Sequence, residues 1–176
     1  MKRGEAGFIA IETIVVVGIM AFVAVGATMS TFQVTKVTER SNASITAVYQ
    51  VQSAGYWISH DGAMADSVIA DNLTPPDFLI LKWTDWGINA DSVYHSATYS
   101  IEDVSQGIGK LTRVHQDSLG LDEHVLVAEY IYYNPDDPDH TTKVSYENSV
   151  LTVRLFSVFG GAEETREYKI YCRPNF

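Results

Sequence analysis

The sequence contains a single cysteine, Cys172, and this scarcity excludes two ways of holding a small domain together. An intrachain disulfide framework and a multi-cysteine zinc site each need more than one thiol. The chain is therefore expected to depend on a packed core. Its 46% hydrophobic and 19% charged residues are sufficient for one and argue against wholesale disorder.

Basic residues are also scarce. The chain has 12 Lys and Arg against 22 Asp and Glu, a formal net charge of −10. Proteins bind phosphate backbones with clustered cations, so no nucleic acid is expected as a partner. The sequence shows no internal repeat or low-complexity tract, and 176 residues suit one globular domain with an appendage.

Long apolar runs are absent after residue 29, but one precedes it. Residues 8–29 carry a single charge, Glu12. As a helix this segment would span about 33 Å, enough for a bilayer core of about 30 Å. We therefore predict a transmembrane helix over 8–29, with the remaining chain on the far side of the membrane.

Three interpretations of the N-terminus follow. A plain signal anchor would keep Lys2 and Arg3 in the cytoplasm by the positive-inside rule. A cleaved secretory signal would end at the small residues 24–27. In the third interpretation a short polar leader, residues 1–7, ends at Gly7, and the mature chain begins with Phe8.

Glu12 favours the third interpretation. A carboxylate at the edge of an apolar span costs a few kcal/mol and usually marks a function or a partner. Cleavage after Gly7 would leave an α-amine on Phe8, one helical turn from Glu12 and on the same face. The carboxylate would then neutralise the amine of its own chain. Alternatively, it would pair with the amine of a neighbouring chain and so hold stacked helices in register.

The segment Gly7-Phe8-Ile9-Ala10-Ile11-Glu12, followed by an apolar run, resembles the processing site of bacterial type IV prepilins and type II secretion pseudopilins. The resemblance implies a prepilin peptidase that cuts between Gly7 and Phe8 and methylates the Phe8 amine. It also implies that Glu12 acts in assembly. Ile11 stands where many members of the family have Leu.

The helical pattern continues beyond the apolar run. Apolar or small residues recur at three- and four-residue steps, which predicts an amphipathic continuation over 30–74 with a stripe that packs on a sheet. The stripe consists of Val34, Val37, Ser41, Ile45, Val48, Val51, Gly55 and Ile58, extended by Met64, Ala65, Val68 and Ile69. Gln50 is predicted to lie off the stripe. We expect a bend near Gly55 or Asp61-Gly62 and a helix end at Asn72 or Leu73, before Pro75-Pro76.

Residues 75–176 read as short β-prone runs joined by turns. Strand candidates are 78–83, 93–101, 109–115, 125–133, 143–146, 149–159 and 167–173, and turns are expected at Gln106-Gly107, Glu147-Asn148 and Gly160-Gly161. The predicted fold class is α+β and pilin-like. In it, one long N-terminal helix packs by its second half on a C-terminal antiparallel sheet.

The region after residue 54 narrows the resemblance. Residues 55–68 resemble the "I-x-R-D-x-x-x-A-x-x-V" stretch of J-type minor pseudopilins and W-type minor pilins, with His60 in place of the usual Arg. Residues 98–101, 111–113, 127–131 and 150–155 follow that group's order of strands, and Cys172-Arg173-Pro174-Asn175 resembles its ending. This resemblance implies a minor subunit that acts at a filament tip or in initiation.

Few residues suggest other chemistry. Asp136, Asp137 and Asp139 are weak calcium candidates in a loop that lacks the EF-hand pattern, and a solvated acidic loop is the alternative. No other cofactor is expected. His60-Asp61 lacks an accompanying nucleophile, so it is interpreted as a polar helix bend or a subunit contact, and no enzyme is predicted. His115 and His124 flank the segment 116–123, which connects two strand candidates, so the two histidines are considered as ligands of a metal site at the strand ends.

The expected function is structural, as a minor pilin or pseudopilin in a type II secretion pseudopilus or a type IV pilus. Expected partners are other pilin or pseudopilin subunits, prepilin peptidase, an inner-membrane assembly platform and membrane lipid. The N-terminus would be cytoplasmic and the C-terminal domain extracytoplasmic. The alternative is a membrane-anchored extracytoplasmic binding domain, an adhesin or a sensor, that does not polymerise.

Overall fold

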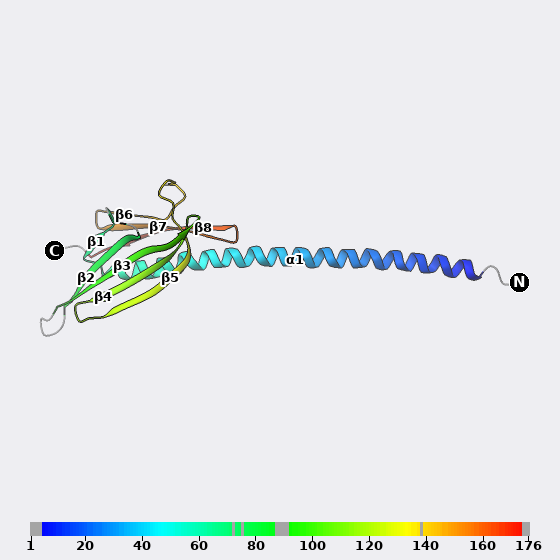
Figure 1. Ribbon diagram of the computed structural model, residues 1–176, viewed down its shortest axis with the longest axis horizontal. Helices are drawn as coiled ribbons and strands as arrows, with labels where there is room; N and C mark the ends of the chain where they lie inside the picture. The colour runs from blue at the N-terminus through cyan, green and yellow to red at the C-terminus, as the bar shows by residue number, and fades with distance from the viewer. Residues whose placement is uncertain (1–4, 72, 75, 87–91, 138, 174–176) are drawn as a thin grey trace. The chain divides into compact units, whose positions relative to one another are not determined.

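The computed structural model describes residues 5–71, 73–74, 76–86, 92–137 and 139–173, with side chains from residue 11 onward. One helix and eight strands make up this part of the chain (Figure 1). They form two compact units, Met1–Asn42 and Ala43–Phe176. The helix α1, Glu5–Met64, is continuous over 60 residues and contributes to both units.

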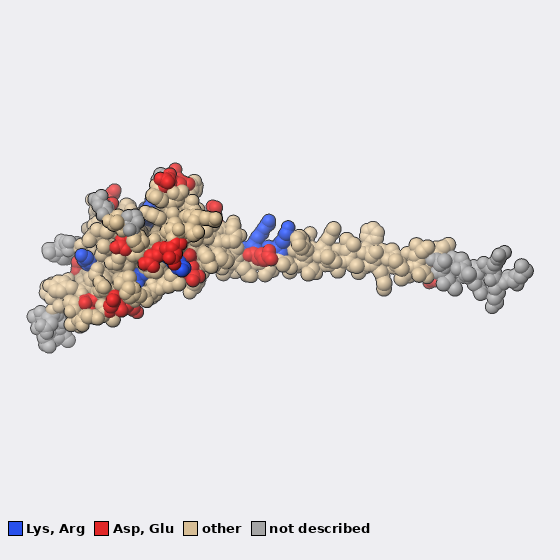
Figure 2. All heavy atoms as spheres, viewed as in Figure 1, with Lys and Arg blue, Asp and Glu red and all other residues tan. Residues whose placement is uncertain are grey.

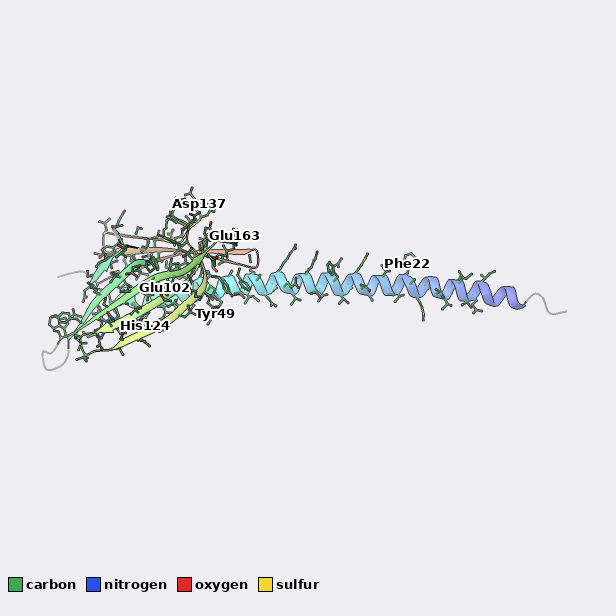
Figure 3. All side chains as sticks on the ribbon, in the orientation of Figure 1. Phe22, Tyr49, Glu102, His124, Asp137 and Glu163 are labelled. Carbon is green, nitrogen blue, oxygen red and sulfur yellow. The ribbon has the colours of Figure 1, made fainter. Side chains whose placement is uncertain are left out.

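The first unit is helical from Glu5 onward, and every side chain described in it, from Ile11 to Asn42, is exposed. Apolar side chains cover all faces, because consecutive residues such as Val15, Val16 and Val17 are each about half exposed or more. Figure 3 shows Phe22, which is 84% exposed, projecting from α1. Between Glu12 and Lys36 the sequence has no charged residue, and the first cations that Figure 2 shows on the helix lie beyond this stretch.

Four threonine hydroxyls in this unit are satisfied inside the helix. The side chains of Thr28, Thr31, Thr35 and Thr38 each donate a hydrogen bond of 2.8–3.0 Å to the backbone carbonyl four residues earlier. Such bonds remove the need for water, as a hydrocarbon environment requires. By length and composition α1 is long and apolar enough to cross a membrane.

The second unit combines the end of α1 with an antiparallel sheet. Its strands are β1 Ser67–Ile69, β2 Asp77–Trp86, β3 Ser92–Ser105, β4 Ile108–Asp117, β5 Asp122–Tyr132, β6 Lys143–Glu147, β7 Val150–Phe159 and β8 Ala162–Tyr171. The strand order is β1-β2-β3-β4-β5-β7-β6, and β8 pairs with β7. The α+β class with a long N-terminal helix and an antiparallel sheet is thereby confirmed.

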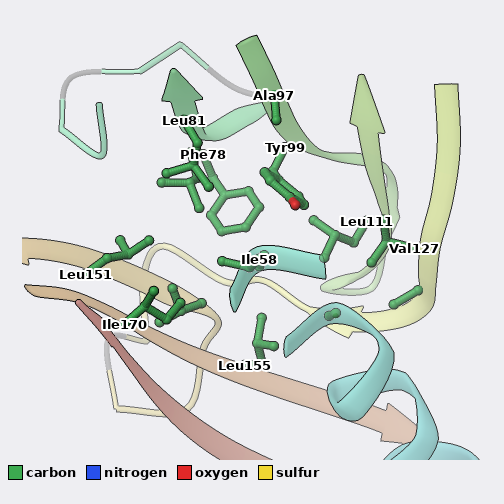
Figure 4. Packing of buried hydrophobic residues seen from close by; sticks show 14 of the residues in the cluster. Ile58, Phe78, Leu81, Ala97, Tyr99, Leu111, Val127, Leu151, Leu155 and Ile170 are labelled. Carbon is green, nitrogen blue, oxygen red and sulfur yellow. The ribbon is translucent and has the colours of Figure 1, made fainter. Parts of the chain in front are cut away.

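The sheet has two parts that meet at one point. Strands β1 to β5 follow one another as neighbours, whereas β5 joins β7 through the single pair Ile131 and Ser157. The last part of α1 packs between these two parts. In Figure 4, Ile58 lies between Leu155 and Ile170 on one side and Tyr99 and Leu111 on the other. This helix segment is therefore the centre of the core.

Three two-residue turns set the register of the hairpins. Positive φ angles occur at Gln106-Gly107, Asn148-Ser149 and Gly160-Gly161, as type I′ turns require. The first and third turns were predicted correctly. The second lies one residue later than the predicted Glu147-Asn148, since Glu147 still pairs with Val150.

The buried face of α1 differs in part from the predicted stripe. Val51 and Ile58 are buried as expected, but Ile45 is 64% exposed. The face that packs on the sheet instead includes Ala43, Ala47 and Ala54. Two close approaches favour small residues on this face: Gly55 lies against the ring of Tyr168 on β8, and Ala43 lies against Gly160 in the turn between β7 and β8.

Gln50, predicted to lie off the stripe, is 9% exposed. Its Oε1 accepts a 2.8 Å hydrogen bond from the backbone N–H of Glu129, and Ser53 donates one of 2.8 Å to the carbonyl of Val127. Both contacts lie on β5, so polar side chains of α1 satisfy backbone groups of β5 that β7 does not pair.

The predicted helix end at Asn72 or Leu73 is wrong, and the helix does not break near Gly55 or Asp61-Gly62, while the bend expected there stays a prediction. The helix α1 passes Gly55 and Asp61-Gly62 without interruption and ends at Met64. Asp66 then turns the chain into the sheet, because its carboxylate accepts a 2.8 Å hydrogen bond from the N–H of Thr84. Val68 and Ile69, assigned to the helical stripe, pair instead with Leu81 and Ile80 of β2. Asn72 and Pro75 lie outside the described residues.

Gly55 offers a test of the close approach between α1 and β8. A methyl group at this position would overlap the phenol ring of Tyr168, whose hydroxyl donates a 3.1 Å hydrogen bond to the carbonyl of Val51. We predict that Gly55→Ala lowers the free energy of unfolding by about 1–3 kcal/mol, as overpacking does. Chemical denaturation of the full chain in detergent, followed by tryptophan fluorescence, measures the change.

The matched control is Gly26→Ala in the same helix, where the added methyl meets no atom within 4 Å. Alanine has a higher helix propensity than glycine, so this variant should be as stable as the original protein or slightly more stable. Equal stability of the two alanine variants would contradict the packing described for Gly55.

Candidate functional site

Three regions carry the charged groups that the sequence or the structure singles out. The first is the N-terminal segment around Glu12, and the second is a buried ion pair that joins α1 to the sheet. The calcium candidates in the loop after β5 form a third.

Glu12 lies in α1 and is exposed. Gly7 and Phe8 belong to α1 by their backbone, but their side chains fall outside the described part of the chain. A continuous helix through these positions places Phe8 and Glu12 one turn apart on one face, as the sequence predicts. The roles of the three residues in cleavage, methylation and assembly stay predictions.

The buried ion pair joins Asp61 of α1 to Arg113 of β4. The carboxylate of Asp61 is fully buried and lies 2.6 Å from Nε and 3.0 Å from Nη2 of Arg113, so the contact is bidentate. The hydroxyl of Tyr99 on β3 donates a third hydrogen bond of 2.6 Å to the same carboxylate. Three elements therefore meet at one carboxylate.

Other side chains complete the surroundings of Arg113. Its guanidinium lies 5.0 Å from the ring centroid of Trp57, a cation–π distance. Its Nη1 lies 3.5 Å from Oε2 of the half-exposed Glu123 on β5. On the other side of the carboxylate, Nδ1 of His60 is 3.4 Å from Oδ1 of Asp61.

The protonation states follow from these contacts. Burial, together with the charge of Asp61, raises the pKa of Tyr99 far above its ordinary value, so the phenol keeps its proton. Burial alone would lower the pKa of Arg113, but the hydrogen bonds and the charge of Asp61 outweigh it and the pKa rises. The carboxylate of Asp61 thus has complementary partners in Arg113 and Tyr99, whereas Nη1 of Arg113 is buried without a hydrogen bond and has only the longer contact to Glu123.

Sequence reasoning missed this cluster. Asp61 was interpreted as part of a polar bend or a subunit contact, and the partnership with Arg113 was not predicted. A signal was present, because Asp61 lies three residues after Ile58 on the buried helix face, and Arg113 lies two residues after the buried Leu111. Opposite charges on two faces that must pack together predict an ion pair, although sequence alone gives no pairing between α1 and β4.

The acidic loop between β5 and β6 uses its polar groups on its own backbone. Oδ1 of Asn134 accepts a hydrogen bond from the N–H of Asp136, and Oδ1 of Asp137 accepts one from the N–H of His140. Asp139 is exposed. In the described part of the chain, no three Asp, Glu, His or Cys residues are grouped closely enough to hold a metal ion. The calcium hypothesis for Asp136, Asp137 and Asp139 therefore stays a prediction that the geometry does not strengthen.

The remaining candidates separate in space. His115 contacts His95 of β3, whereas His124 is exposed and lies 3.2 Å from Asp122. The two histidines that were considered as a strand-end metal site thus face different partners. Cys172 is buried, and burial raises the pKa of its thiol, which disfavours the reactive thiolate.

Comparison of the chain with family models, curated proteins and solved structures found no match in any of the three.

The ion pair makes a measurable prediction. Replacing Arg113 by Met leaves a buried carboxylate without its cation, so we expect the free energy of unfolding to fall by about 3–5 kcal/mol. The double variant Asp61→Leu with Arg113→Met removes both charges and should recover a large part of that loss. Denaturant unfolding of all three proteins, followed by circular dichroism, provides the comparison.

Lys110→Met is the control for this experiment. Lys110 pairs with Asp103 at 2.8 Å, but both side chains are largely exposed to water, so its loss should leave the free energy of unfolding nearly unchanged. An Arg113→Met variant as stable as Lys110→Met would mean that the buried pair does not hold α1 to the sheet.

Proposed function

We propose that this chain is a prepilin-like structural subunit, processed after Gly7 and assembled through the apolar part of α1 into a membrane-rooted filament. The observation that carries the proposal is the division of one continuous helix. Its first part is apolar and exposed on all faces, with Glu12 near its start, and its last part is the centre of an α+β domain.

The exposed apolar segment supports a membrane environment before assembly. Between Glu12 and Lys36 no charge interrupts it, and the hydroxyls of Thr28, Thr31 and Thr35 donate to backbone carbonyls of the helix itself. A segment of this kind is insoluble by itself in water and needs lipid, or other helices of the same kind, around it. A prepilin-like subunit uses both environments in turn.

Glu12 supports assembly rather than simple anchoring. An anchor needs only apolar residues, and a carboxylate within the first turns weakens insertion. In a bundle of such helices the carboxylate of one chain and the α-amine of Phe8 in the next would attract each other strongly in an apolar medium. The pair would fix the axial offset between neighbouring subunits.

The proposal also names partners and location. The second unit would lie on the extracytoplasmic side, and the segment before Phe8 on the cytoplasmic side with Lys2 and Arg3. Prepilin peptidase would remove residues 1–7, and other pilin or pseudopilin subunits would surround the apolar helix at the inner-membrane assembly platform. The resemblance to J-type pseudopilins and W-type pilins makes a minor subunit the specific form of this proposal.

Processing is tested by intact-mass and N-terminal peptide analysis of membrane-extracted protein from cells that contain a prepilin peptidase. The proposal predicts a chain of 176 − 7 = 169 residues that begins with N-methylated Phe8. A chain beginning at Thr28 would indicate ordinary secretion, and an uncut chain beginning at Met1 would indicate a plain anchor. Either outcome would overturn the filament proposal.

Assembly is tested by removing the carboxylate. We predict that Glu12→Leu abolishes incorporation into sheared filaments, because the charge that pairs with the neighbouring amine is lost, while membrane extraction and cleavage at Gly7 persist. Glu12→Asp should retain part of the incorporation. Immunoblots of the filament and membrane fractions provide the measurement.

Glu39→Gln is the matched control, since it removes a carboxylate from an exposed position of the same helix outside the apolar run. It should assemble normally. Normal assembly of Glu12→Leu would instead favour a membrane-anchored binding domain that does not polymerise.

A further inference from the structure

Four titratable side chains form a row across the sheet, one from each of β2, β3, β4 and β5. Asp85 Oδ2 lies 3.4 Å from Nε2 of His95, whose Nδ1 lies 3.2 Å from Nε2 of His115. The row ends at Glu123, whose Oε2 lies 3.9 Å from Nδ1 of His115. The two imidazoles are 15% and 13% exposed, so the centre of the row is shielded from water.

The two imidazoles meet edge to edge. Their centroids are 5.4 Å apart while the nearest nitrogens are 3.2 Å apart, and the ring planes differ by 24°. This geometry fits an N–H···N hydrogen bond between rings that are close to coplanar. Trp83, 4% exposed, lies nearly parallel to both rings at 5.2 and 5.3 Å.

The row has one proton too few when both imidazoles are neutral. It contains three contacts: His95 with Asp85, His95 with His115, and His115 with Glu123. Each contact is satisfied only when one N–H lies between its two partners. Two neutral imidazoles supply two such protons in total. With only two protons at least one contact lacks its N–H: either a carboxylate faces a bare nitrogen, or the two rings face each other through bare nitrogens. One additional proton completes all three contacts.

We propose that the His95–His115 pair is a binding site for one proton, and that its occupation ties the ends of β2, β3, β4 and β5 together in mildly acidic conditions. The charged member is His95, with one N–H toward Asp85 and the other toward His115. A second proton is disfavoured because it would place two N–H groups against each other. The proposal is independent of filament assembly.

The charges around the pair fit this assignment. His95 faces Asp85 and, in register on β4, Asp117. Hydrogen bonds from the N–H groups of Leu121 and Leu119 lower the pKa of Asp117, and His95 makes a smaller contribution in the same direction. His115 lies near Arg113. Burial, then the charge of Arg113, then that of His95 lower its pKa, although Asp61 and Glu123 oppose them. His115 accordingly stays neutral and accepts the hydrogen bond.

Occupation of the site would extend the buried cluster. Glu123 contacts both His115 and Arg113, and Arg113 binds Asp61. With the proton bound, complementary groups alternate from Asp85 on β2 to Asp61 on α1. Without it, Asp85 loses its charged partner, and the ends of β2 and β3 are held there by backbone pairing and by the stacking of Trp83 on His95.

The test is an NMR titration of the full chain in detergent micelles, with ¹⁵N-labelled histidine, between about pH 8 and pH 5, where unperturbed imidazoles titrate. Single His→Gln variants assign the resonances. We expect one proton to enter the pair, with both nitrogens of His95 protonated and Nε2 of His115 bare. A pair in which both rings become cations in one step, or in which neither titration responds to loss of the other ring, would overturn the proposal.

The variant Asp85→Asn provides a second test in case a histidine variant fails to fold. The side chain of Asp85 is 59% exposed, so this substitution should leave the fold intact. Removing its charge should require a proton concentration roughly threefold higher for half-occupation, since the pair is only partly screened by water. Asp136→Asn, which removes an exposed carboxylate from the loop after β5, should leave the titration unchanged. An equal response of the two variants would also overturn the proposal.

Discussion

The carboxylate of Asp61 is the constraint on which the second unit depends. It is fully buried on the last part of α1 and must be paired, and Arg113 and Tyr99 from two adjacent strands provide that pairing. A buried charge without its partner is strongly destabilising, so only one placement of the helix on the sheet is acceptable. Apolar packing around Ile58 supplies the bulk of the core, whereas this cluster fixes the rotation and axial position of the helix.

That constraint explains how one helix can serve two environments. In Ala43–Phe176 the helix is surrounded on two sides by the parts of the sheet, which cover Val51, Ala54 and Ile58. In Met1–Asn42 the described side chains are all exposed, and their composition suits lipid or other apolar helices. The polar cluster belongs wholly to the second unit, so exchanging lipid for neighbouring helices around the first would leave the domain intact. This separation is what the proposed subunit requires.

Periodicity predicted the class of fold but not the details of packing. The strand predicted over 93–101 is found within β3, where Ala97, Tyr99 and Ile101 are buried, because a strand has a period of two whatever it packs against. The helix end was missed, because Val68 and Ile69 satisfy a helical and a strand pattern equally well and the choice is made by Asp66 and β2. β8 was predicted to begin near Glu167 but begins at Ala162, since pairing with β7 outweighs its polar sequence. The His95–His115 contact depends on strand register, which composition does not encode.

Hydrogen–deuterium exchange of the full chain in detergent tests most directly whether the last part of α1 and the sheet are one cooperative unit held by Asp61. The account predicts that amides of residues 47–61 exchange only in the opening that also exposes β3 and β4, with the same free energy. It also predicts that Arg113→Met lowers that free energy in the helix and the strands together. Exchange of residues 47–61 through a separate, easier opening, while β3 and β4 stay protected, would contradict it.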